Sequence, residues 1–529
     1  MLFRGSAVAQ IPAEVVTTLH HAVASGGVIG LLVATSIVAQ EPVEVARRHV
    51  ENHRVEMVEE LRDFLAIPNV ASDLPNIKRN AAALVGMMER RGITTRIIET
   101  GGAPIVYGEI GDPSLPTIMF YCHYDGQAVD PAEWDQDQPW DPLMRTGPLD
   151  DGAQVVPWSD LDRVEDDWRI YARSASDDKA PIVALMHMLD AWQEAGIKLP
   201  NRLKFLFEGD EEAGSKYLPG IMREQRELFA ADLVVMADGP IHPSGNPTAD
   251  FGLRGLVEVT LTVYGPIQPI HSGHYGNWAP NPAMRLAQLL ATMKGPNGEV
   301  LIDGWDDDVI PFGSEEREVL ARYPHDDDVR REQLQMGSVY GTGTTRLELV
   351  SRPSLNVRGM RSMFIGSQAR TIIPDVAVAE LDLRLVSGNS PSRQAAKLRR
   401  HIEQQGYTVV SETPDSLTRL ASPLLVKFDM EATGGYPAGR TPLSEPAARG
   451  LITALGRAGL GTPVVSPTMG GSGPAFVYTD ILQAPFVVVP TVNHDNNQHA
   501  RNENVRLGNF FRSVEILAAA ATAQVRVVP

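Results

Sequence analysis

The chain has 529 residues, of which 43% are hydrophobic and 21% charged, a composition typical of a folded globular protein. Its length predicts two domains rather than one. The 47 Lys and Arg residues against 66 Asp and Glu give a formal net charge of -19, which repels polyanions and argues against nucleic acid as a partner. Its single cysteine, Cys122, excludes an internal disulfide and leaves the redox compartment undecided.

The first forty residues differ in character from the rest of the chain. No charged residue occurs between Ala22 and Ala39, and the run from Gly27 to Ala39 has the length of a signal-peptide core. We therefore predict a leader over residues 1–40, export to the periplasm or the medium, and no stable membrane insertion after processing. A membrane anchor and a cytoplasmic protein are the alternatives.

Helices and buried strands alternate after the leader. Apolar periodicity predicts helices over 42–67, 77–91 and 180–195. Nearly continuous apolar runs predict strands over 94–99, 105–110, 117–122, 202–207 and 233–237. This order predicts an α/β fold with a mixed sheet flanked by helices.

A histidine and an aspartate come directly after the strand at 117–122, where ligands collect in open α/β sheets. His123 and Asp125 are two residues apart on extended backbone, so both side chains point the same way. The Asp125 carboxylate can then accept a hydrogen bond from the second nitrogen of His123. Asp125 is expected to orient His123, although a lone His-x-Asp pair also arises by chance.

Acidic residues occupy three further strand ends or strand-to-helix loops. Asp177 and Asp178 precede the helix at 180–195, and Asp238 follows the strand at 233–237. A denser group follows the strand at 202–207 and consists of Glu208, Asp210, Glu211 and Glu212. Carboxylates this close repel one another unless cations neutralise them, which predicts a metal site. A solvated turn is the alternative for this denser group taken alone.

The motifs together resemble the M20 family of dinuclear zinc peptidases, which includes carnosinase-like dipeptidases and glutamate carboxypeptidases. The resemblance covers roughly residues 50–525 and rests on His123-x-Asp125, Ser176-Asp-Asp-Lys179, Asp210-Glu-Glu-x-Gly-Ser215, Val235-Met-Ala-Asp238 and Gln498-His-Ala-Arg-Asn-Glu503. The chain departs from the family at Ala180, where many members have glycine.

The resemblance implies two zinc ions per chain, with Mn²⁺ or Co²⁺ as alternatives. One ion would be held by His123, Asp177 and Asp238, and the other by Asp177, Glu212 and His499. Asp177 would thus bridge the two ions, as suits a metal pair. Glu211 would act as the general base on a water between the ions. A cis peptide between Asp177 and Asp178 is also implied.

A second α+β unit is expected beyond about residue 250. Its pattern predicts strands over 253–264, 377–386 and 407–411, with helices over 281–293 and 391–405. We place the catalytic domain at 41–249 and 431–529 and the inserted domain at 250–430. The resemblance implies that this insert is a lid through which two chains form a homodimer.

Three residues match family positions that contact the substrate. His271, in a His-Ser-Gly sequence, matches a catalytic histidine that reaches the partner subunit's active site and stabilises the oxyanion. Arg384 resembles a lid arginine that grips a substrate carboxylate, for which a planar fork of donors is suited. Ser472, in the glycine-rich stretch 470–474, resembles a residue that binds the terminal carboxylate. A polar turn, a strand-surface salt bridge and an ordinary loop are the respective alternatives.

The implied activity is that of a metal-dependent dipeptidase or carboxypeptidase that hydrolyses an amide near a free carboxylate of a small peptide. The long insert resembles the carnosinase-like branch. An N-acyl amino acid amidohydrolase is the enzymatic alternative, because the same metals can cleave either bond. A non-catalytic binding protein of the same fold is the alternative of a different class.

Overall fold

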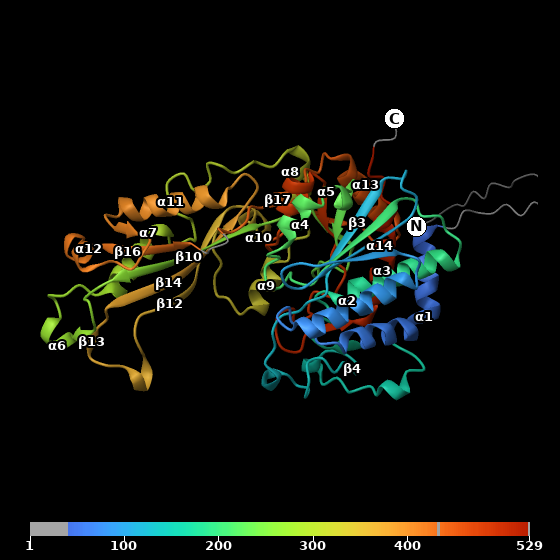
Figure 1. Ribbon diagram of the computed structural model, residues 1–529, viewed down its shortest axis with the longest axis horizontal. Helices are drawn as coiled ribbons and strands as arrows, with labels where there is room; N and C mark the ends of the chain where they lie inside the picture. The colour runs from blue at the N-terminus through green and yellow to red at the C-terminus, as the bar shows by residue number, and fades with distance from the viewer. Residues whose placement is uncertain (1–40, 431–433, 527–529) are drawn as a thin grey trace, which may run out of the picture. The chain divides into compact units, whose positions relative to one another are not determined.

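The computed structural model describes residues 41–430 and 434–526, and its largest sheet has eight strands in the order β1-β2-β6-β3-β7-β19-β8-β18 (Figure 1). These strands are β1 Thr94–Ile98, β2 Ile105–Ile110, β3 Thr117–His123, β6 Arg202–Glu208, β7 Leu233–Met236, β8 Thr248–Asp250, β18 Val464–Ser466 and β19 Phe486–Val488. β3 pairs in parallel with β6 and β7, whereas β1, β2 and β6 pair antiparallel. The predicted mixed α/β sheet is confirmed.

The central strands end at one edge of this sheet. β3 and β7 are buried along their whole length, as expected of strands covered on both faces. In the parallel register, His123 at the end of β3 lies beside Glu208 at the end of β6. The residues that follow β3, β6 and β7 therefore emerge together, where ligands bind in α/β sheets.

Helices α1 Pro42–Leu65, α2 Leu74–Glu89, α3 Lys179–Glu194 and α14 Leu507–Ala521 belong to the same hydrophobic core as the large sheet. α3 is buried continuously from Lys179 to Leu189, so apolar residues occur around the whole helix rather than along one face. It begins directly after the Asp177–Asp178 pair, and it packs against α1 and α14. α3 thus runs from the strand-end edge into the helical layer.

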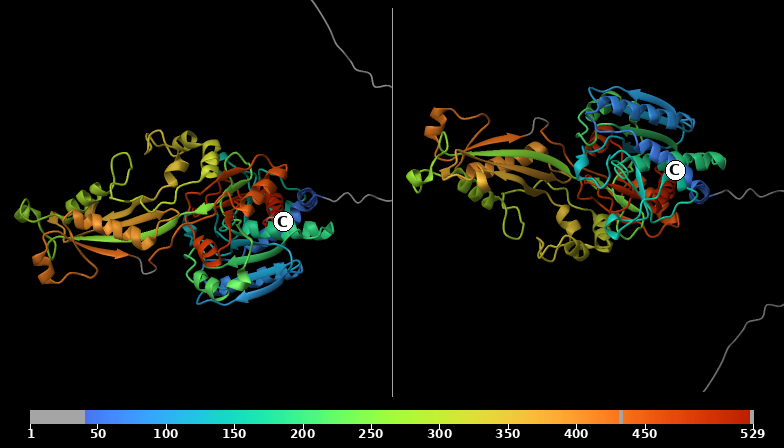
Figure 2. Two further views of the ribbon diagram at one scale, coloured as in Figure 1. Left: turned by 90° about the horizontal axis from the view of Figure 1, so that it is seen from above. Right: turned by 90° about the horizontal axis from the view of Figure 1, so that it is seen from below.

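A second sheet has its own core and the order β12-β14-β10-β16-β15. Its strands are β10 Gly255–Tyr264, β12 Ser354–Arg361, β14 Val376–Leu385, β15 Thr408–Val410 and β16 Leu425–Met430. Figure 2 shows the green β10 beside the orange strands, although they are far apart in the sequence. Alternating burial on β10 and β14 directs one face toward helices α7 Pro282–Met293 and α11 Pro391–Gln404.

The remaining elements are short. A three-stranded sheet contains β4 Leu143–Arg145, β5 Arg169–Tyr171 and β20 Asn504–Arg506, and two-stranded pairs join β9 Gly252–Leu253 to β17 Gly439–Arg440 and β11 Ile270–His271 to β13 Ile372–Ile373. The other α-helices are α4 Leu218–Glu224, α5 Arg226–Phe229, α6 Ser272–Tyr275, α8 Ser314–Arg322, α9 Asp327–Gln333, α10 Arg346–Val350 and α12 Ser416–Ala421, which are short, and the longer α13 Pro446–Arg457.

The strand predicted over 253–264 is divided in the structure. β9 ends at Leu253, and β10 begins at Gly255, where a Cβ would lie 2.4 Å from the carbonyl oxygen of Tyr436. Only glycine permits this close approach of two backbones. All strands of the second sheet fall between Gly255 and Met430, and the domain boundaries at 250 and 430 stay a prediction.

Across residues 41–430 and 434–526, no helix is both long and apolar enough to cross a membrane. The leader predicted over 1–40 lies outside the described residues.

Candidate metal centre

The Asp177 carboxylate lies between two histidines, His123 and His499, that are 376 residues apart in the sequence. Nε2 of His123 is 2.7 Å from Asp177 Oδ1, and Nε2 of His499 is 3.0 Å from Asp177 Oδ2. Each carboxylate oxygen therefore faces a different imidazole. This is the arrangement needed for one carboxylate to bridge two metal ions.

Two more carboxylates complete a donor group on each side of Asp177. Asp238 Oδ2 lies 4.0 Å from His123 Nε2, and Glu212 Oε2 lies 3.3 Å from His499 Nε2. The ligand atoms within each group, Asp177 being shared, all lie within 4.8 Å of one another. The structure therefore brings together the five residues that the resemblance implies as ligands.

Pairing of two strands brings the Asp177 and His499 loops together. β5, which precedes Asp177, pairs antiparallel with β20, which follows His499, and Tyr171 lies opposite Asn504. His499 itself has a φ of 62°, in the left-handed region that a non-glycine residue occupies only when its surroundings hold it there. Nearby, Asn502 exchanges hydrogen bonds with Asp135 at 2.6 and 3.0 Å, which ties this loop to the connection between β3 and β5.

Burial and mutual repulsion shift the pKa values of the carboxyl groups. Burial and the nearby Asp177 carboxylate raise the pKa of Asp238 to about 6 and that of Glu212 to about 7. Burial opposes ionisation of Asp177 as well, but hydrogen bonds from His123 and His499 hold its pKa below the usual range. The hydrogen bond to Asp177 raises the pKa of His499 to about 8. The raised pKa values of Asp238 and Glu212 reflect a concentration of negative charge that a bound cation would neutralise.

The donor set fits divalent metal ions. In the described part of the chain, Asp238 Oδ1 is buried without a hydrogen-bond partner. Such an oxygen carries a desolvation penalty that coordination to a cation would relieve. Histidine nitrogens and carboxylate oxygens are ligands that suit Zn²⁺, and Mn²⁺ or Co²⁺ accept similar sets. The residues therefore fit a pair of such ions.

Asp125 lies where the sequence places it, beside His123. Its backbone carbonyl accepts a hydrogen bond from His123 Nδ1 at 3.1 Å, and its Oδ1 lies 3.4 Å from the same nitrogen. Its carboxylate also accepts from the backbone N–H groups of Glu211 and Glu212, at 3.2 and 3.0 Å. Asp125 thus couples the position of His123 to the turn that carries Glu211 and Glu212.

Glu211 has the electrostatic environment of a carboxyl group that can hold a proton. Burial raises its pKa well above the usual range, and the Asp238 and Glu212 carboxylates add to this effect against the opposing influence of His123. A buried carboxyl group with a perturbed pKa beside candidate ligands is a candidate for proton transfer.

The implied cis peptide between Asp177 and Asp178 is present. Asp178 Oδ2 accepts the backbone N–H of His123 at 3.4 Å. Lys179 points away from the donor groups, and its Nζ donates to the carbonyls of Phe64 and Ile67 at 2.8 and 2.9 Å. Lys179 therefore anchors the C-terminal end of α1 to the start of α3.

Glu503 supports the Asp177 loop in a way that the sequence does not reveal. This buried carboxylate accepts the backbone N–H groups of Ser174, Ser176 and Asp177 at 3.1, 3.0 and 3.0 Å. It also pairs with the buried Arg173 at 2.7 Å. The motif around His499 contains Glu503, but its contacts depend on the pairing of distant loops.

Two glutamines also contact the candidate ligands. Gln498 Nε2 donates to Asp177 Oδ2 at 2.6 Å, and Gln127 Nε2 donates to Glu212 Oε2 at 2.7 Å. Neutral donors of this kind orient a ligand carboxylate without competing with a metal for charge. Gln498 belongs to the motif that contains His499, whereas Gln127 has no motif that would mark it.

Arg384 and Ser472 contact each other, although they come from segments far apart in the sequence. Arg384 Nη1 donates to Ser472 Oγ at 2.7 Å, and Arg384 Nε donates to Asp382 at 3.1 Å. Arg254 pairs with Ser472 in an isolated β-bridge, and burial together with the charge of Arg384 lowers the pKa of Arg254 to about 10. This group concentrates positive charge that an anionic substrate group would neutralise.

His271 is not brought into the donor groups of its own chain. Its exposed ring accepts the backbone N–H of Gly273 at 3.0 Å and lies 4.4 Å, centroid to centroid, from the ring of His274. These contacts are local to the turn between β11 and α6.

Several known proteins are similar to this chain over most of its length. The model of peptidase family M20/M25/M40 matches residues 119–523. The Cys-Gly metallodipeptidase dug1 of Schizosaccharomyces pombe is 26% identical over 88% of this chain and 95% of its own length. The Beta-Ala-His dipeptidase of Rattus norvegicus is 24% identical over 89% and 93%. Among solved structures, an M20 family metallo-carboxypeptidase from Sulfolobus solfataricus matches with a TM-score of 0.72 at 26% identity, over 88% of this chain and 99% of that one.

The comparisons also correct one prediction. Export was expected from the apolar run between Gly27 and Ala39. The Cys-Gly metallodipeptidases that match most of this chain are cytosolic enzymes, which contradicts that expectation. An apolar run of this length is a weak signal, because it depends on hydrophobicity alone and not on a specific contact.

Proposed function

The chain belongs to peptidase family M20/M25/M40, and from that premise we propose that it hydrolyses dipeptides at a centre of two divalent metal ions. The observation that carries the proposal is the Asp177 carboxylate, which faces His123 on one side and His499 on the other. Asp238 and Glu212 provide one further donor to each side.

When bound, the two ions would activate a water and polarise the scissile carbonyl. Glu211 then accepts a proton from the attacking water and returns it to the leaving amine. Its raised pKa and its attachment to the Asp125-held turn support this role. Asp125 positions both His123 and Glu211, so it acts through them.

Arg384 and Ser472 bind the free carboxylate of the substrate in this proposal. The guanidinium donates to Ser472 Oγ and is about one-third exposed, so donors remain available to a bound anion. Recognition of a carboxylate next to the scissile amide favours short peptides. The names of the relatives, Cys-Gly and Beta-Ala-His dipeptidases, favour dipeptides over N-acyl amino acids.

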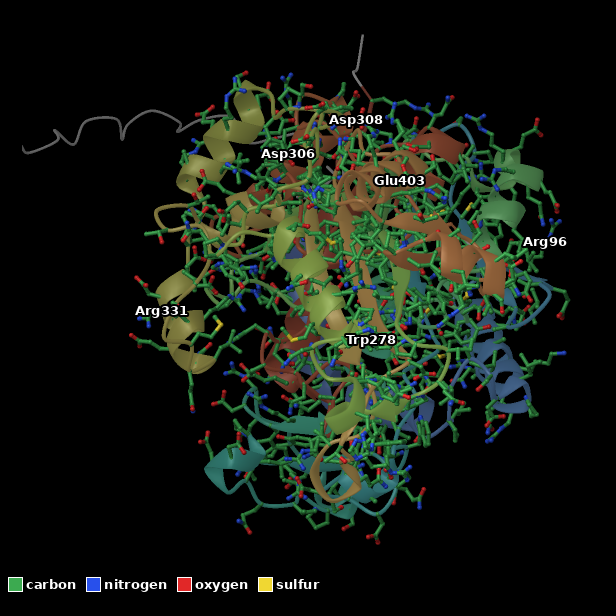
Figure 3. All side chains as sticks on the ribbon, turned by 90° about the vertical axis from the view of Figure 1, so that its left-hand side faces the viewer. Arg96, Trp278, Asp306, Asp308, Arg331 and Glu403 are labelled. Carbon is green, nitrogen blue, oxygen red and sulfur yellow. The ribbon has the colours of Figure 1, made fainter. Side chains whose placement is uncertain are left out.

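We also propose that two chains associate through the unit that contains the five-stranded sheet, with His271 completing the partner's site. Figure 3 looks onto this unit and labels Trp278, which is 79% exposed. Ile365 and Leu420, from other segments of the same unit, are 89% and 87% exposed. Large apolar side chains left in water are typical of surfaces that bind another protein.

The Glu211→Gln variant tests the proposed function. It should retain the metal content of the parent and lose activity toward dipeptides by about 10³-fold, because the amide cannot accept the proton. Glu224→Gln, an exposed substitution on α4, is the matched control and should leave kcat unchanged. Near-normal turnover by a metal-loaded Glu211→Gln enzyme would rule out this base.

A further inference from the structure

A cavity of about 270 Å³ lies among residues of α8, α10 and β17 and of the segments that adjoin them (Figure 1). Its apolar lining includes Leu253, Val309, Ile310, Phe312, Leu320 and Val386. Among the described residues, none of the candidate metal ligands lines this cavity, and neither Arg384 nor Ser472 does. The proposed hydrolysis therefore makes no use of this space.

Backbone pairing fixes the walls of the cavity. Leu253 of β9 lies opposite Gly439 of β17 in an antiparallel pair. The backbone N–H of Ile310 donates to the carbonyl of Ser387 at 2.9 Å, which joins two further segments of the lining. Segments that are far apart in the sequence are thus held together by the protein itself. A concave, mostly apolar and preformed space of this kind is typical of sites for small molecules.

The charged residues of the lining are mainly basic. Arg317, Arg352 and Arg440 line the cavity, and Glu348 is the one acidic residue of the lining among the described residues. In the described part of the chain, none of the three guanidinium groups forms an ion pair with a carboxylate. The Glu348 carboxylate caps α10, because it accepts the backbone N–H and the hydroxyl of Thr345 at 2.9 and 2.8 Å. This excess of positive charge attracts an anion.

Arg440 is the guanidinium with the poorest compensation. Its Cζ lies 4.9 Å from the centroid of the Phe312 ring, and its Nη2 reaches the carbonyls of Ile310 and Pro311 only at 3.4 Å. Burial lowers the pKa of Arg440 against the opposing charge of Glu316, whose carboxylate accepts a backbone N–H at 2.9 Å instead. An anion in the cavity would supply the short charge-assisted hydrogen bonds that Arg440 lacks.

We propose that this cavity binds a small monocarboxylate with an apolar body, whose carboxylate pairs with Arg440 and whose body packs on the apolar lining. The planar guanidinium matches the geometry of a carboxylate, and the Phe312 ring beside it is apolar. The volume suits a small molecule rather than a peptide or a lipid. Short aliphatic acids and aromatic acids share this chemistry. A dipeptide fits less well, because its ammonium group would meet the same guanidinium groups.

The cavity adjoins the segments that carry the proposed substrate-binding arginines. Leu253 directly precedes Arg254, and Val386 follows Arg384 by two residues. The carbonyl of Arg352 accepts a hydrogen bond from Arg254 Nη2 at 2.8 Å. A ligand in the cavity would therefore contact the segments behind the substrate carboxylate, although its binding does not depend on the proposed hydrolysis.

Equilibrium dialysis of the metal-loaded protein tests the proposal with two probes, 3-phenylpropionate and hexanoate. At least one should bind saturably at one site per chain, and the tighter probe identifies an aromatic or an aliphatic body. The neutral 3-phenylpropionamide and acetate should bind at least about 10-fold more weakly, because each lacks one half of the interaction. The proposal would be overturned by an absence of saturable binding of both probes below about 10 mM, or by equal binding of the amide.

Three variants locate the bound probe. Arg440→Gln should weaken binding of the acids by about 10-fold or more, which corresponds to the loss of a hydrogen bond between charged groups. Arg457→Gln, an exposed arginine on α13, is the matched control and should bind as the parent does. Arg384→Lys should also match the parent. Loss of binding in Arg384→Lys, with full binding in Arg440→Gln, would place the probe at the substrate site and contradict the proposal.

A steric variant covers the case in which Arg440→Gln does not fold. Leu320 lies on α8 with a partly exposed side chain, so Leu320→Trp can fill the cavity without removing a fully buried residue. Circular dichroism and cooperative thermal unfolding establish that each variant is folded. Folded Leu320→Trp should bind neither probe. Undiminished binding of the probes by this variant would show that they bind elsewhere.

Discussion

Four residues contact the carboxylate or the backbone N–H of the buried Asp177. His123, His499 and Gln498 contact its two oxygens, and Glu503 accepts its backbone N–H. Contacts from three sides fix the orientation of the carboxylate before any ion arrives. Such preorganisation lowers the cost of binding and supports the bridging role proposed for this residue.

The carboxylate-binding role of Arg384 can be tested on two substrates. Arg384→Lys keeps the charge but loses the planar pair of guanidinium donors. The value of kcat/KM for a dipeptide should therefore fall by about 10- to 100-fold, which corresponds to the loss of one hydrogen bond to a charged group. The corresponding dipeptide amide, which lacks the anion, should be hydrolysed with little change. Arg393→Lys on α11 is the control, since this side chain is 61% exposed and pairs with Asp308. Equal losses on both substrates would argue against carboxylate recognition by Arg384.

The candidate ligands could be predicted from the sequence because each stands in a motif at the end of a strand or in a loop. His123, Asp177 and Asp238 need only the order of strands and loops to be placed at one edge of the sheet. Glu503 and Gln127 could not be assigned in this way. Their contacts arise from the β5–β20 pairing and from the turn after β6, and local sequence does not encode either geometry.

At the scale of elements, the long strands at the centre of the large sheet were predicted closely, whereas the edge strand β12 and the short buried strands β5, β8 and β19 were not predicted. β3 and β6 are mostly apolar and buried, and their predicted ranges agree with the structure to within one residue. β12 was not predicted, because it is an edge strand whose residues are mostly exposed, including Arg358 and Arg361. β12 lacks an apolar pattern and is held in the sheet by its antiparallel backbone pairing with β14.

The pairing of β8 with β18 predicts a pH dependence of stability. Asp250 lies opposite Ser466, which donates a hydrogen bond to it, and burial raises the pKa of Asp250 to about 6. The pKa of an aspartate in the unfolded chain is about 3.9. Between pH 4 and pH 6, roughly, the folded state therefore binds more protons than the unfolded state. The free energy of unfolding consequently falls as the pH rises through this range. Asp250→Asn removes the penalty and should stabilise the protein by about 2 kcal/mol at pH 7.

Denaturant unfolding of the parent and Asp250→Asn at pH 4 and pH 7 checks this expectation. The difference in the free energy of unfolding should be larger at pH 7, because the parent carboxyl is then ionised. A variant that is less stable than the parent at pH 7 would show that the hydrogen bond from Ser466 outweighs the burial penalty.

At the scale of the whole molecule, the proposed site needs two chains. His271→Ala and Glu211→Gln should each be almost inactive alone, because each lacks one component of every site. Mixed dimers of the two variants should regain activity, since one site then combines an intact Glu211 with the His271 of the other chain. Mass analysis of the mixture verifies that mixed dimers are present. Verified mixed dimers without activity would contradict action of His271 across the interface.

The distribution of the candidate ligands along the chain also has a consequence for biosynthesis. His499 follows His123 by 376 residues and Asp177 by 322 residues in the sequence. During synthesis, a nascent chain that has not yet reached residue 499 can present only one complete donor group. Hydrolysis that requires both groups would therefore begin only after residue 499 has been synthesised, and premature termination before His499 would release an inactive product.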